Sequence, residues 1–580
     1  MKFKDIFRIG RKEKEMSWYK TYDKENIKRH INIPDVSIFE LLNKTAVKYP
    51  TYIAYNYYGK EKTYHEFVLS IRKCARAFKT LGIKKGDIVT ICMPNTPEAL
   101  ISFYALNLIG AIANMVHPLS SEGEIKTYLQ MTKSETIVSA DFTWDKINNI
   151  INETNLKTVI LASVDISMNK ITQIGYFLTK GRKIKKVKDN DKVIYWSKFY
   201  ELSNNYHEKL CDNNKGNTPA VILYSGGTTG TPKGIILSNM NLNALVLEDL
   251  EVCKKLRPQV SILSVMPIFH GFGLGCCVHA CFVAGGKSIL LPTFSPKTFD
   301  DLVMKYKPNI IAGVPTLFET LINSKKLNNK DLSYLTCLIS GGDNLSPSLK
   351  HKIDDFLKSH GSNTIIRPAY GLTEATAGVC MTPVNESRDN SIGVPVPDTY
   401  IKIVVPSTHT EVASGIEGEI CVNGPTVMMG YLNNPKETSQ ALQYHEEDKK
   451  VWLHTGDLGY VDKDGFVYFK QRLKRMIVSS GYNIYPSYIE EVIEEHPSVL
   501  TSTVIGIDHP HKVQVAKAYI VLKEGFKPTS EIKKSIKEHC EKNIAKYAMP
   551  YVFEYRSTLP RTKLGKVNYK VLEDENNIKK

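Results

Sequence analysis

A run of small and hydroxyl-bearing residues, Tyr224–Gly234, is the part of the chain best suited to hold a phosphate group. It reads YSGGTTGTPKG. Glycines let the backbone approach a ligand closely, successive N–H groups can surround an anion, and Lys233 adds a positive charge. The run is not a Walker sequence, because Pro232 precedes Lys233, Gly234 follows it, and no helix is expected to begin there. The alternative is a plain surface turn, and we predict a phosphate-binding loop.

Acidic residues further along the chain could complete such a site. Glu374 lies in the small polar segment Tyr370–Glu374, YGLTE, and Mg²⁺ is commonly held by one or two carboxylates together with phosphate oxygens. We therefore predict that Glu374 binds Mg²⁺, the alternative being a glutamate at a helix N-terminus. Asp457, Arg472 and Lys566 also lie in polar segments, and each taken alone would be interpreted as a surface charge.

The cysteines do not form an evident metal or disulfide pattern. There are eleven of them without a C-x-x-C pair, and Cys276, Cys277, His279 and Cys281 lack the spacing of a zinc site. Met1–Lys14 is charged throughout and does not read as a signal peptide. We expect reduced cysteines in a cytoplasmic protein.

The net charge of +16 raises nucleic acid and anionic membranes as partners. Eleven of these sixteen surplus charges lie in residues 1–30 and 180–188. A nucleic-acid-binding protein would spread its basic residues along a groove lined with stacking aromatics. The distribution therefore predicts no nucleic-acid partner and favours two local surface contacts.

Residues 258–286 contain no Asp, Glu, Lys or Arg, a length that could cross a membrane. Pro267, five glycines and His270 interrupt the run. We therefore predict a strand, a turn and a short buried helix around a pocket.

The elements that must position these residues alternate between helical patterns and short β-branched strands, which predicts an α/β fold with largely parallel sheets. The predicted strands are Asp87–Met93, Thr136–Ser139, Thr158–Leu161, Val221–Tyr224, Ser288–Leu291, Ile310–Ala312 and Cys337–Ser340.

Beyond Glu411 hairpin patterns predict a β-rich subdomain, with strands in Gly418–Asn423 and in Gly459–Phe469, which turns at Asp464-Gly465. A small α+β domain should follow. Its predicted elements are a helix near Ser487–Glu495, strands near Thr501–Ile507 and Ala516–Leu522, and a helix capped by Ser530. We predict a basic arm over residues 1–30, a large body over 31–471 with an insertion at about 163–200, and a mobile C-terminal domain over 472–580.

Together these segments resemble the signatures of the adenylate-forming enzymes, which include acyl-CoA synthetases, firefly luciferase and the adenylation domains of peptide synthetases. Their order and spacing match, and the similarity covers about residues 30–575. The matching segments are Tyr224–Gly234, Tyr370–Glu374, Thr455–Asp457, Gln471–Lys474, Pro560–Lys566, Gly481–Pro486, and Gly418-Glu419 through Gly430-Tyr431.

The resemblance implies a role for each segment. The phosphates of ATP would lie on Ser225, Gly226, Gly227, Thr228, Thr229 and Gly230. The catalytic groups would be Lys233, Thr373, Glu374 and Lys566. The adenosine would contact Gly341, Gly342, Asp343, Tyr370, Gly371, Asp457 and Arg472. The hinge would be Lys474, and the CoA channel would include Ser480, Gly481 and Tyr482.

The resemblance also implies a two-step reaction with ATP, Mg²⁺ and CoA. A carboxylate would attack the α-phosphate to give an acyl-adenylate and pyrophosphate, and the thiol of CoA would then displace AMP. Lys233, Lys566 and Mg²⁺ would offset the repulsion between the two anions. Rotation of the C-terminal domain about Lys474 would admit the thiol.

An acid with an apolar body is the expected substrate. Amino-acid-activating relatives have an acidic residue about where this chain has His270, so a substrate ammonium group would be buried without a partner. We expect His270 near the substrate carboxylate and Phe272, Leu274 and Val314 along an apolar channel. The alternative for His270 is a satisfied core histidine.

Two features resemble bacterial long-chain fatty-acid CoA ligases. Met16–Tyr22 contains their W-x-x-x-Y pattern, and Ile171–Lys188 resembles an extra segment that they carry. The apolar residues and six cations of this insertion suit an anionic bilayer, whereas the alternative is a solvated charge run. We expect a cytoplasmic protein that contacts the inner face of the membrane through residues 171–188 and the N-terminal arm.

Other functions stay open. They are ligation of a medium-chain, aryl or bile-type acid, and formation of an acyl-adenylate that loads a carrier protein. An inactive nucleotide or lipid sensor is disfavoured because Lys233, Glu374, Asp457, Arg472 and Lys566 are all present.

Overall fold

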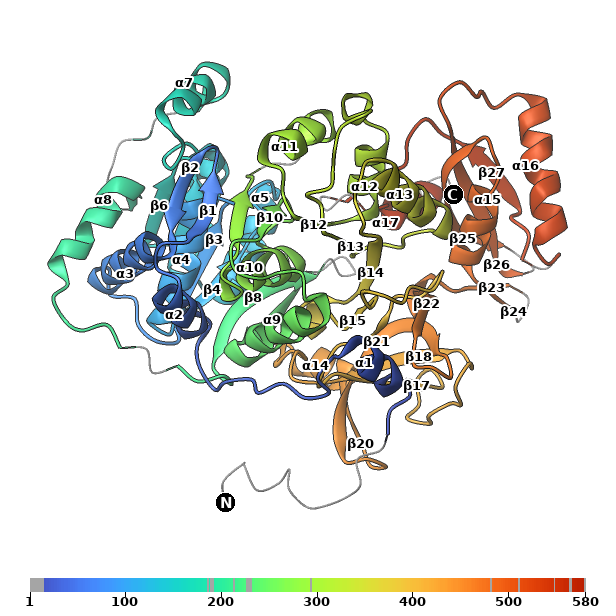
Figure 1. The fold of residues 1–580 in the computed structure, drawn as a ribbon, viewed down its shortest axis with the longest axis horizontal. Coiled ribbons are helices and arrows are strands. Elements are labelled where there is room, and N and C mark those ends of the chain that lie inside the picture. Colours follow the sequence, from blue (N-terminus) through green and yellow to red (C-terminus); the bar gives the residue numbers. More distant parts are fainter. Residues whose placement is uncertain are drawn as a thin grey trace.

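The structure is a computed structural model. It describes residues 15–184, 187, 192–211, 214–225, 232–292, 295–479, 482–509, 512–546, 548–562 and 566–577. Figure 1 shows a large α/β body, a β-rich unit below it and a C-terminal unit at the right. The predicted α/β fold is confirmed, because the described strands form two long, mostly parallel sheets in the body.

The first sheet has the strand order β19-β9-β8-β4-β3-β5-β6-β7. The pairs from β8 to β7 are parallel, and β9 and β19 pair antiparallel. The strands are β3 (Ile88–Cys92), β4 (Ile112–Met115), β5 (Thr136–Ala140), β6 (Thr158–Ala162), β7 (Val193–Tyr195), β8 (Pro219–Ser225), β9 (Lys233–Ser238) and β19 (Gly430–Tyr431).

The second sheet has the order β16-β15-β14-β13-β12-β10-β11-β1-β2, with parallel pairing from β14 to β1. The strands are β1 (Ile53–Tyr57), β2 (Lys60–Thr63), β10 (Ser261–Ser264), β11 (Lys287–Leu290), β12 (Ile310–Gly313), β13 (Cys337–Ser340), β14 (Ile366–Tyr370), β15 (Cys380–Met381) and β16 (Val394–Pro395). All seven strands predicted in the body are present in these two sheets.

Helices pack on both sheets and bury large apolar clusters between them and the strands. α4 is buried along its whole length, as expected for a helix that is apolar on most sides. The helices of the body are α1 (Tyr19–Glu25), α2 (Ile38–Lys48), α3 (Tyr64–Thr80), α4 (Pro97–Leu108), α5 (Glu122–Thr132), α6 (Trp144–Ile150), α7 (Lys170–Thr179), α8 (Trp196–Glu201), α9 (Asn239–Cys253), α10 (Ala280–Val283), α11 (Phe299–Tyr306), α12 (Pro315–Ile322), α13 (Pro347–Ser359) and α14 (Pro435–Ala441).

The apolar run 258–286 folds as predicted. β10 is followed by a turn, a π-helix over Phe272–His279 and the short helix α10. Among the described residues, no helix is both long and apolar enough to cross a membrane.

The β-rich unit has the strand order β17-β18-β21-β20, with β22 paired to β21. Its strands are β17 (Tyr400–Val404), β18 (Gly418–Asn423), β20 (Leu442–His445), β21 (Lys450–Val461) and β22 (Val467–Arg472). The predicted hairpin is present, since β21 and β22 are antiparallel and Gly465 turns between them with φ +89°.

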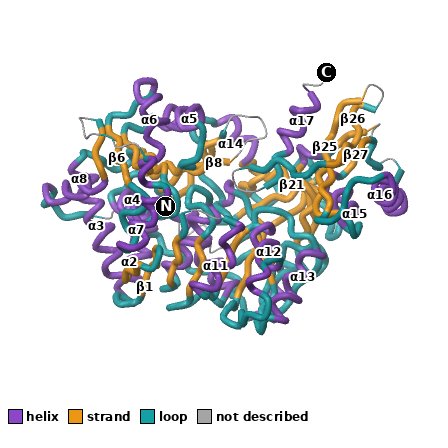
Figure 2. The backbone as a smooth tube through the Cα atoms, turned by 90° about the horizontal axis from the view of Figure 1, so that it is seen from above, coloured by secondary structure: helices purple, strands orange, loops and turns teal. Residues whose placement is uncertain are grey.

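The C-terminal unit is a sheet with the order β24-β23-β26-β25 and β27 beside β26. Figure 2 shows α17, β25, β26 and β27 grouped at one end of the molecule. The elements are β23 (Ile477–Ser479), β24 (Tyr482–Ile484), α15 (Pro486–Glu494), β25 (Val499–His509), β26 (Val513–Leu522), α16 (Ser530–Asn543), β27 (Val552–Tyr555) and α17 (Tyr569–Asn577). The domain boundary at 471/472 stays a prediction.

One expectation needs correction. Thr529 caps α16, not Ser530, because Thr529 has extended backbone angles and its side chain accepts from the Ile532 N–H. In the described part of the N-terminal arm, Trp18, Tyr19 and Tyr22 are buried against the body. The Tyr22 hydroxyl donates to the Pro395 carbonyl at 2.6 Å. Residues 1–14 lie outside the described part.

Candidate active site

Many of the predicted site residues lie just beyond the carboxyl ends of four neighbouring strands, β10, β12, β13 and β14. Val314 follows β12, Gly341–Asp343 follow β13, and Tyr370 ends β14. His270 lies in the segment after β10. Because these strands are parallel, their carboxyl ends meet at one edge of the sheet, which is where ligands bind in open α/β folds.

The described ends of the phosphate loop lie in the other sheet. Ser225 ends β8 opposite Lys233, the first residue of β9. The Lys233 ammonium group forms an ion pair with Glu437 and lies 4.9 Å from the ring centre of Tyr431. Gly226, Gly227, Thr228, Thr229 and Gly230 lie outside the described residues.

Glu374 joins the two sheets. Its Oε1 accepts from the Tyr431 hydroxyl at 3.0 Å and from the Ser225 hydroxyl at 3.4 Å. The adjacent Thr373 is buried. The carboxylate of Glu374 thus lies beside the end of the phosphate loop, where it could share a cation with bound phosphates.

The backbone after Glu374 is tightly constrained. Thr376 is fully buried with φ +67°, and its hydroxyl donates to the Thr426 carbonyl at 2.6 Å. A Cβ atom on Gly271 would lie 1.8 Å from the Thr376 oxygen, and one on Gly371 would lie 1.2 Å from the Ala377 oxygen. Glycine is therefore required at both positions. Without side chains, Gly271 and Gly371 pack directly on the same loop, which contains Thr376 and Ala377.

A second group of polar side chains lies at the opposite end of the site. The Tyr370 hydroxyl donates to Asp457 Oδ2 at 2.7 Å, and Arg472 Nε lies 3.4 Å from Asp457 Oδ1. Asp457 and Arg472 are cross-strand partners in β21 and β22. Burial raises the pKa of Asp457, and Arg472 and the Tyr370 hydrogen bond act against that rise. The Asp457 oxygens are placed to accept from the hydroxyls of a sugar.

Lys566 reaches this group from the C-terminal unit. Its Cε lies 3.8 Å from the position of a Cβ on Gly342, and Val314 Cγ1 lies 3.6 Å from the same point. Burial lowers the pKa of Lys566, while the charges of Asp343 and Asp457 raise it. The Thr562 N–H donates to the Lys566 carbonyl at 2.6 Å, and the Lys566 N–H donates to the Thr562 hydroxyl, which closes the loop.

The predicted acyl pocket is brought together only in part. Phe272 lies 3.6 Å from the position of a Cβ on Gly341, and Val314 lies beside Gly342. His270 Nδ1 accepts from the Phe272 N–H at 3.2 Å, and burial together with the charge of Lys566 lowers the pKa of His270 to about 4. Leu274 is fully buried in a different apolar cluster from Phe272.

The remaining predicted residues are described incompletely. Ser480 and Gly481 lie outside the described residues. For Lys474 and Tyr482 only the backbone is described, in a short 3₁₀ turn and at the start of β24.

Sequence reasoning assigned no role to several residues that contact the site. Tyr431 and Glu437 contact Glu374 and Lys233, and Tyr431 was part of a matched segment. Arg475, next to the predicted hinge, donates to Glu490 at 2.6 Å and lies 3.7 Å from the Tyr569 ring centre. Each of these residues is an isolated polar side chain in the sequence, so no local pattern could have identified it as part of the site.

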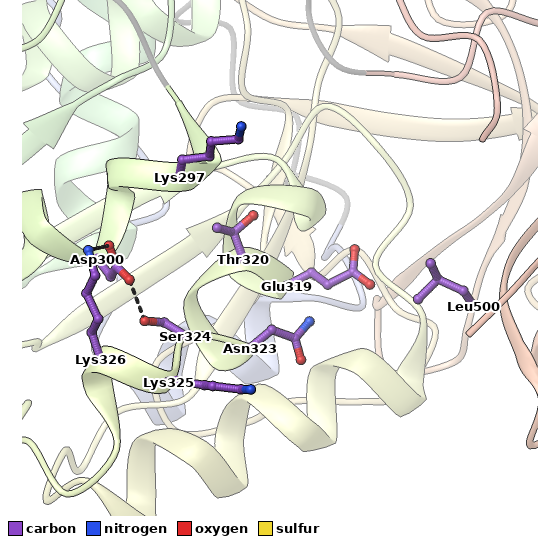
Figure 3. A pocket seen from close by; sticks show the side chains of 9 residues that line it. All are labelled: Lys297, Asp300, Glu319, Thr320, Asn323, Ser324, Lys325, Lys326 and Leu500. Atoms are coloured by element: carbon purple, nitrogen blue, oxygen red, sulfur yellow. Dashed lines mark hydrogen bonds and ion pairs between the residues drawn. The ribbon is translucent and has the colours of Figure 1, made fainter. Parts of the chain in front are cut away.

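A cavity of about 600 Å³ lies elsewhere, between α11, α12 and the start of β25. Figure 3 shows its polar lining with Leu500 of the C-terminal unit at one side. None of the candidate site residues lines it.

Comparisons with known proteins show the fold and the family of the chain. The structure of ATP-bound MatB from Rhodopseudomonas palustris has a TM-score of 0.81 at 24% identity, covering 94% of this chain and 100% of that one, which shows the same fold. In sequence, the chain is 31% identical to the long-chain-fatty-acid–CoA ligase of Bacillus subtilis (strain 168), over 97% of this chain and 99% of that protein. It is also 29% identical to the probable 4-coumarate–CoA ligase 3 of Dictyostelium discoideum, over 90% and 91%.

Two family models match the same regions that the structure brings together. The model described as AMP-binding enzyme covers residues 42–432, which hold the phosphate loop, Glu374 and the edge of the second sheet. The model described as AMP-binding enzyme C-terminal domain covers residues 488–566 and ends on Lys566. Because the first match spans more than half of the chain, the protein belongs to the AMP-binding enzyme family.

Proposed function

We propose that the protein activates a long-chain fatty acid with ATP and then transfers the acyl group to CoA. Family membership supports acyl-adenylate chemistry, and the full-length similarity to a long-chain ligase supports the substrate. The observation that carries the proposal is the position of Lys566 against Gly342, near Asp343 and Asp457. A cation held there is placed to stabilise negative charge on a reacting phosphate.

In the first step, a carboxylate oxygen of the fatty acid bonds to the α-phosphorus of ATP. The bond from that phosphorus to the bridging oxygen breaks, and pyrophosphate leaves with the electron pair. Both reactants are anions, so Lys566 and Thr373 would act at the α-phosphate. Lys233 would exchange its ion pair with Glu437 for a phosphate oxygen.

Glu374 is suited to hold Mg²⁺ with the phosphates. In the described part of the chain, its hydrogen-bond donors are the neutral hydroxyls of Ser225 and Tyr431, so its charge is available to a cation. Bound Mg²⁺ would withdraw charge from the phosphate oxygens.

The nucleoside would lie between the second sheet and the β-rich unit. Tyr370 and Gly371 would form one wall of an adenine site, and the backbone of Gly341, Gly342 and Asp343 the other. Asp457 would accept from the ribose hydroxyls, and Arg472 would pair with the sugar or the phosphate. The Tyr370–Asp457 hydrogen bond of 2.7 Å supports this arrangement, because it holds the Asp457 carboxylate next to Tyr370.

In the second step, the thiolate of CoA attacks the acyl carbonyl and AMP leaves. Lys566 occupies one approach to that carbonyl, so the C-terminal unit would rotate about Lys474 and place Ser480, Gly481 and Tyr482 along the thiol channel.

The half-reactions test the assignment of Lys566. We expect Lys566→Ala to slow acyl-adenylate formation by about 10²–10³-fold or more, because it removes the charge that offsets the phosphate. Thioester formation from supplied acyl-adenylate should stay within a few-fold of the wild type. The control is Lys570→Ala, an exposed lysine of α17. Equal loss of both half-reactions would exclude the assignment.

The acid itself is tested by a substrate panel. His270 is neutral at physiological pH, and Phe272 and Val314 give the site an apolar wall, which suits an uncharged acyl chain. Pyrophosphate release should be fastest with saturated acids of long chain and slower with medium-chain, aryl and bile-type acids. If pyrophosphate release were fastest with an aryl acid, the chain would instead be a ligase of aryl acids. The acceptor is tested by measuring acyl-CoA formation. If acyl transfer occurred only to a carrier protein, that protein would be the acceptor in place of CoA.

We also propose that α7 docks on an anionic membrane, which would give access to dissolved fatty acid. Its outer face is apolar: Ile171, Ile174, Phe177 and Leu178 are 84%, 62%, 53% and 55% exposed. Tyr176 packs against the core, and Gln173 donates to the Asp165 carbonyl, so these two residues hold the other face on the body. Figure 1 shows α7 at the periphery of the molecule.

The charges around α7 support an anionic partner. Lys170 begins the helix, and exposed Lys180, Arg182 and Lys183 follow it. Basic residues near an anionic surface contribute about 1 kcal/mol each. An outward apolar face flanked by cations suits the headgroup boundary of a bilayer.

Co-sedimentation with liposomes tests this docking. We expect wild-type protein to bind vesicles that contain phosphatidylglycerol and to bind pure phosphatidylcholine weakly. Replacing Ile171, Ile174, Phe177 and Leu178 by Ser should reduce binding by about tenfold or more. The control is Val47→Ser with Leu119→Ser, which are 74% and 62% exposed outside α7. Unchanged binding of the α7 variant would refute the docking site.

A further inference from the structure

Three histidines of the β-rich unit lie together outside the candidate active site. His445 ends β20, His454 lies in β21, and His409 lies in the loop between β17 and β18. One ring nitrogen from each lies within 4.8 Å of those of the other two. Imidazole nitrogen is among the preferred ligands of Zn²⁺ and related ions, so this spacing is that of a metal site.

The hydrogen bonds of His454 orient it as a ligand. Its Nδ1 lies 3.0 Å from Glu419 Oε2, and its Nε2 lies 2.9 Å from His445 Nε2. A carboxylate accepts hydrogen bonds, so Nδ1 of His454 carries the proton and Nε2 offers a lone pair. Metal-binding histidines are commonly held by a carboxylate in this way.

His445 has a nitrogen that the protein leaves unused. The residue is completely buried, and its Nδ1 has no hydrogen-bond partner among the described residues. Nδ1 can therefore carry the ring proton, which leaves Nε2, the nitrogen that faces His454, with a lone pair for a metal. His409 stacks on His445 with ring centres 4.0 Å apart, and it is half-buried, so an ion can reach the group from solvent.

Charges of both signs lie near the three histidines. Glu419 is buried beside His454, and the ammonium group of Lys402 is paired with Asp448 at 3.2 Å. Ligand atoms of Glu419, Cys421 and His454 also lie within 4.8 Å of one another. The site therefore combines three imidazoles with the Glu419 carboxylate, which pairs with no lysine among the described ion pairs.

We propose that His409, His445 and His454 bind one first-row transition-metal dication, with Zn²⁺ as the best match and Glu419 orienting His454. Two nitrogens on a tetrahedral zinc ion lie about 3.3 Å apart, from Zn–N distances near 2.0–2.1 Å. The 2.9 Å between His445 Nε2 and His454 Nε2 needs only a small opening, in which the ion replaces the shared proton. His409, whose Nε2 lies 2.9 Å from Gln443 Oε1, would supply the third nitrogen.

The site is connected to the candidate nucleotide site. Glu419 Oε1 accepts from the Gly456 N–H at 3.0 Å, and Gly456, with φ +70°, directly precedes Asp457. An ion on His454 would hold Glu419 and thereby the backbone that carries Asp457. This second part rests on the proposed function, whereas metal binding does not.

The test uses untagged full-length protein with Cys211→Ser, which removes the exposed cysteine. Protein is equilibrated with ZnCl₂ without nucleotide, dialysed, and analysed for bound zinc. A Co²⁺ titration followed by visible absorption reports the coordination geometry. The variants are His409→Ala, in a half-exposed loop, and His445→Gln. The control is His351→Ala, which removes an exposed histidine of α13.

We expect one Zn²⁺ per chain and a tetrahedral Co²⁺ spectrum for the parent and the His351→Ala variant. His409→Ala and His445→Gln should weaken binding at least tenfold. No stoichiometric zinc in the parent, or equal affinity in all variants, would overturn the metal site. If zinc binds but leaves the KM for ATP unchanged, the proposed effect of the metal on Asp457 is wrong. The metal site itself would still be supported. Loss of all ligase activity in every protein would instead count against the proposed function.

Discussion

At the scale of single residues, the candidate active site is a set of charges that partly offset one another. Asp457 is buried, Lys566 is half-buried and Asp343 is exposed. Partial loss of water around these groups raises the pKa of both carboxyls and lowers that of Lys566. Their mutual attraction acts against these shifts. Such groups cost stability unless they are paired, so their retention fits a site that binds a charged ligand.

The lowered pKa of Lys566 predicts a pH dependence for adenylate formation. The ammonium form should be lost below the ordinary lysine value of about 10.4, so kcat/KM should fall on the alkaline side earlier than for a free lysine. Lys566→Arg keeps its charge and should remove this decline at a lower overall rate. Pyrophosphate release between about pH 6 and 10 measures both proteins, and an identical decline in the variant would exclude Lys566 as its origin.

Replacing Asp457 should weaken ATP binding without lowering the thermal stability of the protein. Because burial raises its pKa, the ionised carboxylate is unfavourable in the folded protein at neutral pH. Asp457→Asn should therefore leave the Tm unchanged or higher, while the KM for ATP rises about tenfold or more. Calorimetry and steady-state kinetics measure the two effects, with the exposed Asp355→Asn as control. A large fall in Tm would indicate a structural role only.

At the scale of elements, the site depends on loops held at the ends of parallel strands. The segment after β14 carries Glu374 and contains Thr376 at positive φ. Gly271 and Gly371 pack directly on the backbone of this segment. The loop after β10 and the loop after β14 therefore hold each other in place. Close backbone packing of this kind fixes the Glu374 carboxylate before a ligand binds.

Gly371→Ala should disturb this packing. The new Cβ would lie 1.2 Å from the Ala377 oxygen, so backbone must move, at a cost of about 1–3 kcal/mol. Denaturant unfolding measures the loss, and ATP binding should weaken with it. Gly123→Ala in α5 meets no atom within 4 Å and should stabilise by up to about 1 kcal/mol. Equal stability of the two variants would contradict the tight packing.

At the scale of the whole molecule, the C-terminal unit adds Lys566 to groups supplied by the body and the β-rich unit. Its apolar clusters are formed by residues from 477 onward, and Lys566 is the group that crosses to Gly342. The covalent connection runs through the short 3₁₀ turn Leu473–Arg475. A reaction with two steps could use two positions of this unit.

Lys474→Pro should separate the two steps. Proline fixes φ near −65° and resists a backbone rotation at this position. Adenylate formation should stay within a few-fold of the wild type, because Lys566 is already in place, whereas thioester formation should fall about tenfold or more. Lys474→Ala is the control, since it removes only the side chain. Equal effects on both half-reactions would place the hinge elsewhere.

The sequence by itself determined what depends on neighbours along the chain. The alternation of strands and helices, the hairpin at Gly465 and the loop at Tyr224–Gly234 each carry a local pattern. It therefore predicted the seven body strands, the β-rich unit and the order of the site segments. It missed the cap of α16 by one residue, because Thr529 and Ser530 are equally good caps in isolation.

Only the tertiary structure decided which distant residues meet. Tyr431 on Glu374, Glu437 on Lys233 and the group of His409, His445 and His454 arise from sheet order. The burial of Trp18 and Tyr22 against the body was likewise not evident from the sequence. These contacts depend on how finished elements pack across long stretches of sequence, and a single polar or aromatic residue carries no local signal of its partner.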